Sequence, residues 1–81
     1  MIGERVRALV GRFAPGGPEG VADERPLAGA GGLGFDSVRL VELLLACEDE
    51  LGVALPVEEV LRDAPLTVGR LVAFVERQAA P

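Results

Sequence analysis

The sequence contains no histidine and no lysine, and only 4% of its residues are aromatic. Without histidine there is no imidazole to act as a general base or as a metal ligand. The missing histidine and lysine together argue against turnover of a substrate by this chain alone. The sequence therefore predicts no catalytic residue and no metal site, and it predicts a protein that is not an enzyme.

The composition also argues against a membrane protein, a nucleic-acid-binding protein and a protein of an oxidising compartment. Cys47 is its single cysteine, so no internal disulfide can form, which fits a reducing cytoplasm. No apolar run approaches the ~20 residues that span a bilayer, and nothing resembles a signal peptide. The net charge is −5 and all eight basic residues are arginines. An acidic surface argues against nucleic acid and anionic membranes, and favours partners with basic patches.

Hydrophobic residues are plentiful, at 49% of an 81-residue chain. A core of leucine, valine and alanine suits a small helical bundle, and the length allows one small domain, residues 1–81. Apolar spacing, capping residues and breakers predict an all-α fold of three longer helices and one short helix, with residues 79–81 frayed. The predicted helices span residues 2–13, 36–51, 57–62 and 68–78. A long loop, residues 19–35, separates the first two helices.

The loop is rich in glycine but does not match a nucleotide-binding motif. Gly29, Gly31, Gly32 and Gly34 are followed by no lysine and preceded by no strand, and neither the Walker nor the dinucleotide spacing is met. We therefore expect no phosphate-cradling function from these glycines.

Ser37 lies where this loop enters the second predicted helix. Asp36 is a good N-cap, because its carboxylate can accept hydrogen bonds from the first free backbone N–H groups. A phosphate ester on Ser37 would lie at the positive end of that helix. The two residues alone leave two interpretations open, a simple helix cap or an anionic modification site.

The second predicted helix has two apolar stripes. One is a core stripe that contains Leu40, Leu43, Leu44, Cys47 and Leu51. The other contains Val38, Val41 and Leu45, and is flanked by Glu42, Glu48 and Asp49. This second stripe either widens the core or forms an interaction surface rimmed by carboxylates. We expect Cys47 to be a small buried hydrophobe, and the acidic residues follow no calcium-loop pattern.

The segment Leu33-Gly34-Phe35-Asp36-Ser37-Val38, with Val41-Glu42-Leu43 and Glu48-Asp49-Glu50-Leu51-Gly52-Val53 after it, resembles the acyl carrier protein family. The resemblance covers roughly residues 2–78, and Val38 stands where the family usually has leucine. It implies a small four-helix bundle with 4'-phosphopantetheine, derived from coenzyme A, attached to Ser37 beside Asp36. It also implies a carrier that holds acyl or polyketide intermediates as thioesters and presents them to partner enzymes.

Partners follow from the same resemblance. A phosphopantetheinyl transferase would load the chain, and acyl-loading and acyl-processing enzymes would contact its second helix with basic docking patches. The expected recognition residues are Val38, Val41, Glu42, Leu45, Glu48 and Asp49. The long loop would be pinned to the bundle by Val21, Leu27, Leu33 and Phe35. We expect the third helix to turn Val60 and Leu61 inward, near the mouth of an acyl-binding cleft.

The predicted pathway and cargo depend on one residue of the motif and on the composition of the chain. Phe35 replaces the second glycine of the Leu-Gly-Gly-(His or Asp)-Ser-Leu motif of peptidyl carriers, which favours acyl over aminoacyl cargo. The glycine-rich loop and the arginine-only basic set favour a secondary-metabolite pathway, such as polyketide or antibiotic biosynthesis, over housekeeping fatty acid biosynthesis. The alternatives are a peptidyl carrier protein and a helical adaptor that binds a protein through its acidic second helix. Nothing requires more than a monomer.

Overall fold

The structure is a computed structural model that describes residues 1–63 and 66–79. Within these residues it contains four α-helices, one short 3-10 helix and no strand beyond an isolated bridge between Pro26 and Thr67. The elements are α1 (Ile2–Phe13), η1 (Pro18–Gly20), α2 (Ser37–Leu51), α3 (Val57–Arg62) and α4 (Val68–Ala79). The predicted all-α fold is confirmed, with every helix end within one residue of its expected position.

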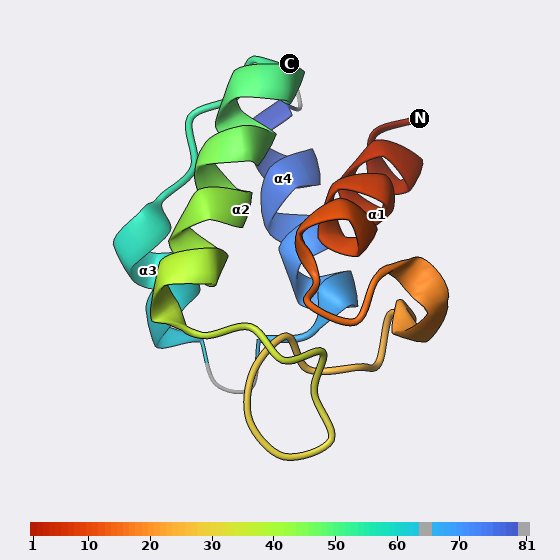
Figure 1. The fold of residues 1–81 in the computed structure, drawn as a ribbon. Helices are drawn as coiled ribbons and strands as arrows, with labels where there is room; N and C mark the ends of the chain where they lie inside the picture. The colour runs from red at the N-terminus through yellow and green to blue at the C-terminus, as the bar shows by residue number, and fades with distance from the viewer. Residues whose placement is uncertain (64–65, 80–81) are drawn as a thin grey trace.

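The three longer helices form a bundle, with α3 beside α2 and the long loop crossing one end (Figure 1). Along the chain, α1 runs towards the loop, and α2 and α4 run away from it. The start of α1 and the last turn of α4 therefore lie at the end of the bundle opposite to the start of α2. None of the helices in the described part of the chain has the length and apolar composition needed to cross a membrane.

The core between the helices is almost entirely aliphatic. In α2 the predicted core stripe is confirmed, because Leu40, Leu43, Leu44 and Cys47 are buried and Leu51 is half-buried. They pack with buried leucine and valine side chains of α1 and α4, and no polar side chain is buried among the described residues. Burial of one leucine contributes about 1.5–3 kcal/mol. Because helices of 12 to 15 residues are marginal in isolation, this core stabilises the bundle.

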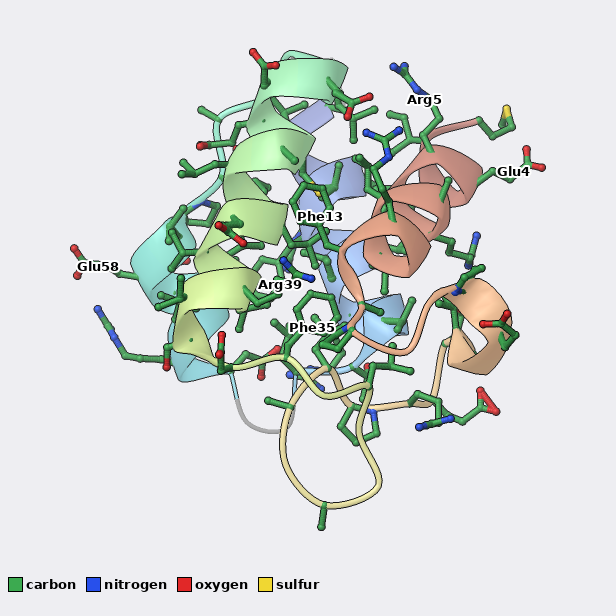
Figure 2. The ribbon with its side chains drawn as sticks, viewed as in Figure 1. Glu4, Arg5, Phe13, Phe35, Arg39 and Glu58 are labelled. Atoms are coloured by element: carbon green, nitrogen blue, oxygen red, sulfur yellow. The ribbon has the colours of Figure 1, made fainter. Side chains whose placement is uncertain are left out.

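The long loop is tied to the bundle by apolar side chains and by backbone hydrogen bonds. Leu27 and Phe35 are buried, and Val21 and Leu33 are half-buried, as expected. Figure 2 shows Phe35 at the loop end of the core. The Leu27 N–H donates to the Leu66 carbonyl oxygen at 2.9 Å. The loop is therefore fixed to the start of α4 by backbone hydrogen bonds and to the core by apolar side chains.

Arg25 organises the glycine-rich part of the loop from within. Its guanidinium donates to the carbonyl oxygens of Gly20, Gly31 and Gly32 at 3.3, 2.9 and 3.1 Å. Gly29 and Gly31 have φ values of 84° and 75°, in the region that favours glycine, so the chain reverses there without strain. The glycines thus allow a tight turn whose carbonyl groups bind one side chain.

Helix α3 corrects one expectation. Val60 is fully buried, but Leu61 is 41% exposed rather than inward-facing. Consecutive helical residues point about 100° apart, and α3 lies at the outside of the bundle beside α2 (Figure 1), so only Val60 of this pair is turned into the core. At the C-terminal end, Ala79 is the last residue of α4, and Ala80 and Pro81 lie outside the described residues.

Cys47 gives the protein a measurable pH dependence. Burial, with smaller effects of Glu50 and Glu48, raises the pKa of its thiol from 9.0 to about 11. Above pH 9 the unfolded chain loses this proton while the folded chain keeps it, so the stability present below pH 9 falls towards pH 11. No lysine or tyrosine titrates in this range. We expect the thermal midpoint of the wild type to fall more steeply from pH 9 to 11 than that of Cys47→Ala. Parallel curves would contradict this assignment.

Candidate functional site

Ser37 is the first residue of α2, and its side chain is exposed. Asp36 is the N-cap, as predicted, because its Oδ1 accepts a hydrogen bond from the Arg39 N–H at 2.7 Å. The other N–H groups of the first turn have no acceptor within the helix, so this end keeps its partial positive charge. The helix start therefore combines an accessible hydroxyl with surroundings that favour an anion on it.

The residues before Ser37 fix its position. Gly34 has φ 90°, and a Cβ at this position would lie 3.6 Å from the Pro15 ring. This backbone conformation turns the chain from the loop into Phe35, which is 4% exposed and donates its N–H to the Leu27 carbonyl oxygen at 3.0 Å. Because Phe35 is anchored in the core, Ser37 is held at the surface two residues later.

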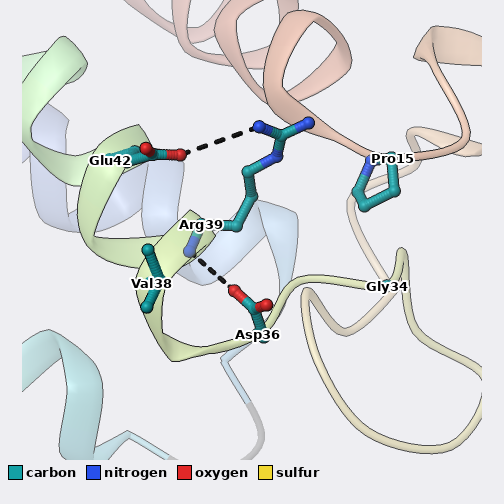
Figure 3. Close-up of a pocket in the computed structure, with 6 residues that line it drawn as sticks. All are labelled: Pro15, Gly34, Asp36, Val38, Arg39 and Glu42. Carbon is teal, nitrogen blue, oxygen red and sulfur yellow. Dashed lines mark hydrogen bonds and ion pairs between the residues drawn. The ribbon is translucent and has the colours of Figure 1, made fainter.

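A hollow of about 390 Å³ lies beside the start of α2 (Figure 3). Both chain neighbours of Ser37 line it. The lining residues are Pro15, Gly34, Asp36, Val38, Arg39 and Glu42. The Arg39 Nη1 lies 3.7 Å from the Glu42 Oε1, and both side chains are about half exposed. This hollow is therefore bordered by one cation and two carboxylates, next to the exposed hydroxyl.

A second hollow, of about 300 Å³, lies between the loop, α2 and α3. Its lining is mostly leucine, with one carboxylate from Asp63. The lining residues are Leu27, Ala28, Gly29, Leu40, Leu61, Asp63 and Leu66. The Asp63 carboxylate accepts two hydrogen bonds from the Arg70 guanidinium, at 2.7 and 2.8 Å. Arg39 and Leu40 are adjacent in α2, but the hollow that Arg39 lines is bordered by charged groups, whereas the hollow that Leu40 lines is mostly apolar.

The second apolar stripe of α2 stays at the surface. Val38 is 70% exposed and Leu45 is 53% exposed, whereas Val41 is half-buried. Glu42 and Asp49 beside them are exposed. These side chains form one solvent-facing surface, which we call the α2 face and define as Val38, Val41, Glu42, Leu45 and Asp49. Its role in recognition remains a prediction.

Glu48 differs from its acidic neighbours. Its Oε2 accepts a hydrogen bond from the Leu55 N–H at 2.8 Å, so the side chain connects the end of α2 to the link before α3. Glu50 pairs with Arg12 of α1 at 2.9 Å. Gly52 ends α2 in the left-handed conformation at φ 66°. Two of the three consecutive acidic residues therefore hold the fold together, a role that the sequence pattern did not show.

No group of three or more histidine, cysteine, aspartate and glutamate side chains is arranged to hold a metal ion in the described part of the chain. For a covalent phosphate ester, by contrast, the fit is good. The Ser37 hydroxyl faces solvent at the positive end of α2, and a hollow adjoins it. Ser37 is thus a chemically suitable attachment point.

Comparisons with known proteins give a matching family and several similar proteins. The sequence matches the family described as "Phosphopantetheine attachment site" over residues 4–75. It is similar to the acyl carrier protein of Sinorhizobium fredii (strain NBRC 101917 / NGR234), with 39% identity over 82 positions that cover 98% of this chain and 96% of that protein. The acyl carrier proteins of Bradyrhizobium sp. (strain ORS 278) and Rhodopseudomonas palustris (strain TIE-1) are each 37% identical over 78 residues, covering 96% of this chain and 94% of each relative. No solved structure matches.

Proposed function

Because this chain belongs to the acyl carrier protein family, we propose that Ser37 is the residue that carries its covalent 4'-phosphopantetheine. The protein is a carrier and not a catalyst. The observation that supports Ser37 is its place as the exposed first residue of α2, directly after the Asp36 cap. Ser37 is also the only serine in the sequence.

In the loading reaction this chain supplies the nucleophile, and the transferase supplies the base. The Ser37 Oγ attacks the phosphorus of coenzyme A that bears the pantetheine, one O–P bond forms, and the pyrophosphate bond breaks to release adenosine 3',5'-bisphosphate. The transferase takes the hydroxyl proton, because this chain has neither histidine nor lysine to accept it. The attached group supplies a terminal thiol for thioester linkage. The carrier then keeps its cargo at high effective concentration for successive enzymes.

We propose acyl rather than aminoacyl cargo, in a secondary-metabolite pathway. Phe35 stands where peptidyl carriers have glycine, and here its ring is part of the core. A glycine at this position would remove that anchor and leave a cavity beside Leu27. Residues 1–81 would act as one monomeric carrier domain in the cytoplasm, where a free cysteine such as Cys47 stays reduced.

The α2 face is the proposed docking surface for partner enzymes. Val38 and Leu45 offer apolar contacts, and Glu42 and Asp49 offer carboxylates to basic patches on a transferase or an acyl-processing enzyme. Exposed charges of this kind accelerate encounter more than they strengthen the final complex. The proposed docking is therefore fast, transient and sensitive to salt.

The test is mass spectrometry after incubation with coenzyme A, magnesium and a broad-specificity phosphopantetheinyl transferase. We expect the intact mass to rise by one phosphopantetheine. Trypsin cleaves after Arg12 and Arg39 and is blocked where Pro26 follows Arg25, so the added mass should be on the peptide of residues 13–39. An unmodified chain, or the mass on the peptide that contains Thr67, would refute the attachment at Ser37. If the chain is only a helical adaptor, the Ser37→Ala variant will still bind its partner.

A further inference from the structure

Arg39 is the arginine nearest to Ser37 along the sequence, two residues after it. Within residues 1–63 and 66–79 its side chain pairs only with Glu42, and their contact is long, at 3.7 Å between half-exposed groups. An exposed pair of this kind contributes at most about 1 kcal/mol, so a stronger acceptor would displace Glu42 readily. By comparison, Arg7 and Arg70 are each held to a carboxylate by two short hydrogen bonds, at 2.7 to 3.0 Å.

Position in the helix lets Arg39 reach the serine. With Asp36 as N-cap and Ser37 as the first helical residue, Arg39 is the third, the position from which a side chain can reach back to the helix start. In the structure the side chain extends towards Glu42, so reaching the serine requires a change of the Arg39 side-chain conformation. Figure 3 shows the Arg39 guanidinium turned towards Glu42 and away from Asp36, with Pro15 and Gly34 across the hollow that these residues line. There is consequently room for an anion on this side of the helix start.

We propose that Arg39 positions the phosphodiester once Ser37 is loaded, by exchanging Glu42 for a non-bridging phosphate oxygen. This inference rests on the attachment at Ser37 proposed above. The exchange is favoured because the phosphodiester is a full negative charge at the positive end of α2, and a guanidinium–phosphate hydrogen bond is charge-assisted. It directs the first part of the arm over the polar hollow lined by Pro15 and Gly34. Loading also frees the Glu42 carboxylate, so the α2 face differs between the unloaded and loaded carrier.

Nuclear magnetic resonance (NMR) spectroscopy tests this without any substitution. With ¹⁵N-labelled arginine, the Nε–H resonance of Arg39 should shift between the unloaded and the loaded wild type, whereas that of Arg62 should not. Arg62 is a matched control, because it also lies on a helix surface and pairs with one exposed carboxylate, Glu58, at 3.4 Å. The shift should shrink in 1 M salt, where the Debye length is only about 3 Å.

Arg39→Gln and Arg62→Gln provide the second measurement. Mass spectrometry first establishes that each variant carries the group, on the tryptic peptide 13–39 in Arg62→Gln and on the peptide 13–62 in Arg39→Gln, which lacks the cleavage site at residue 39. The ³¹P spectra are then compared. We expect the phosphodiester resonance of Arg39→Gln to move towards that of the same serine phosphodiester in the urea-unfolded carrier, and that of Arg62→Gln to coincide with the wild type. Full loading with an unshifted Arg39 resonance and identical ³¹P spectra would overturn the inference and leave the proposed function intact. A chain that is never loaded would overturn both.

Discussion

Ser37→Ala should gain no mass from coenzyme A and the transferase, against complete conversion of the wild type. The only other side-chain hydroxyl in the sequence is that of Thr67, which is half-buried and accepts the Arg70 N–H at 3.2 Å as the cap of α4. Because Ser37 is exposed, its replacement should change the free energy of unfolding by less than about 0.5 kcal/mol. The measurement is intact mass together with a thermal melt.

Thr67→Ala is the control for that experiment. It removes the other hydroxyl, should still be loaded fully, and should lose about 1 kcal/mol of stability because a cap is lost. The two substitutions therefore separate a functional hydroxyl from a structural one. Loading of Ser37→Ala, or its failure in Thr67→Ala at a temperature where that variant is folded, would show that the wrong hydroxyl was assigned.

Reversing two charges on the α2 face should slow loading at low salt by at least about tenfold, since electrostatic steering changes encounter rates by 10 to 10³. The variant is Glu42→Lys with Asp49→Lys, both at exposed positions. The matched control is Glu4→Lys with Glu76→Lys, which changes the net charge equally on α1 and α4. The measurement is the rate of transferase modification. The difference in modification rate between the two variants should become much smaller in high salt, because salt screens the exposed charges. Equal rates at low salt would show that partners do not read the α2 face.

Glu48 is left out of that variant for a structural reason. The Leu55 N–H donates to its carboxylate, and Leu55 is only 7% exposed. Loss of the acceptor would leave a nearly buried donor unpaired, at a cost of about 1–3 kcal/mol. A slow Glu48→Lys variant would therefore mix a destabilised fold with weakened docking, whereas Glu42→Lys and Asp49→Lys separate the two effects.

Local signals account for most of what the sequence predicted correctly. Asp36 and Thr67 begin helices and Gly52 ends one because the relevant hydrogen bonds and backbone angles involve residues within one turn. The core stripe of α2 was equally clear, because helical periodicity alone decides which of its side chains share a face. The exposed position of Ser37 at the helix start follows for the same reason, since a cap and the residue after it are adjacent in sequence, whereas its role as the attachment point stays a prediction.

What the sequence missed depends on contacts between distant segments. A Cβ on Gly11 of α1 would lie 2.9 Å from the Cβ of Pro18, so this glycine lets η1 pack closely against the helix. Nothing in the sequence indicated that Arg25 binds three carbonyl oxygens of the loop. The hollow beside Ser37 needs Pro15, which lies after the end of α1. No periodicity or spacing reveals such pairs before the chain is folded.

The opposite placement of Met1 and Ser37 has a practical consequence for surface chemistry. With no lysine in the sequence, a protein prepared as residues 1–81 has one primary amine, the α-amine of Met1, and Met1 is 92% exposed. An amine-reactive bead or chip would therefore capture every molecule through one atom and in one orientation. Because Met1 lies at the far end of the bundle from the start of α2 (Figure 1), each immobilised copy would present its serine outward to a flowing enzyme solution.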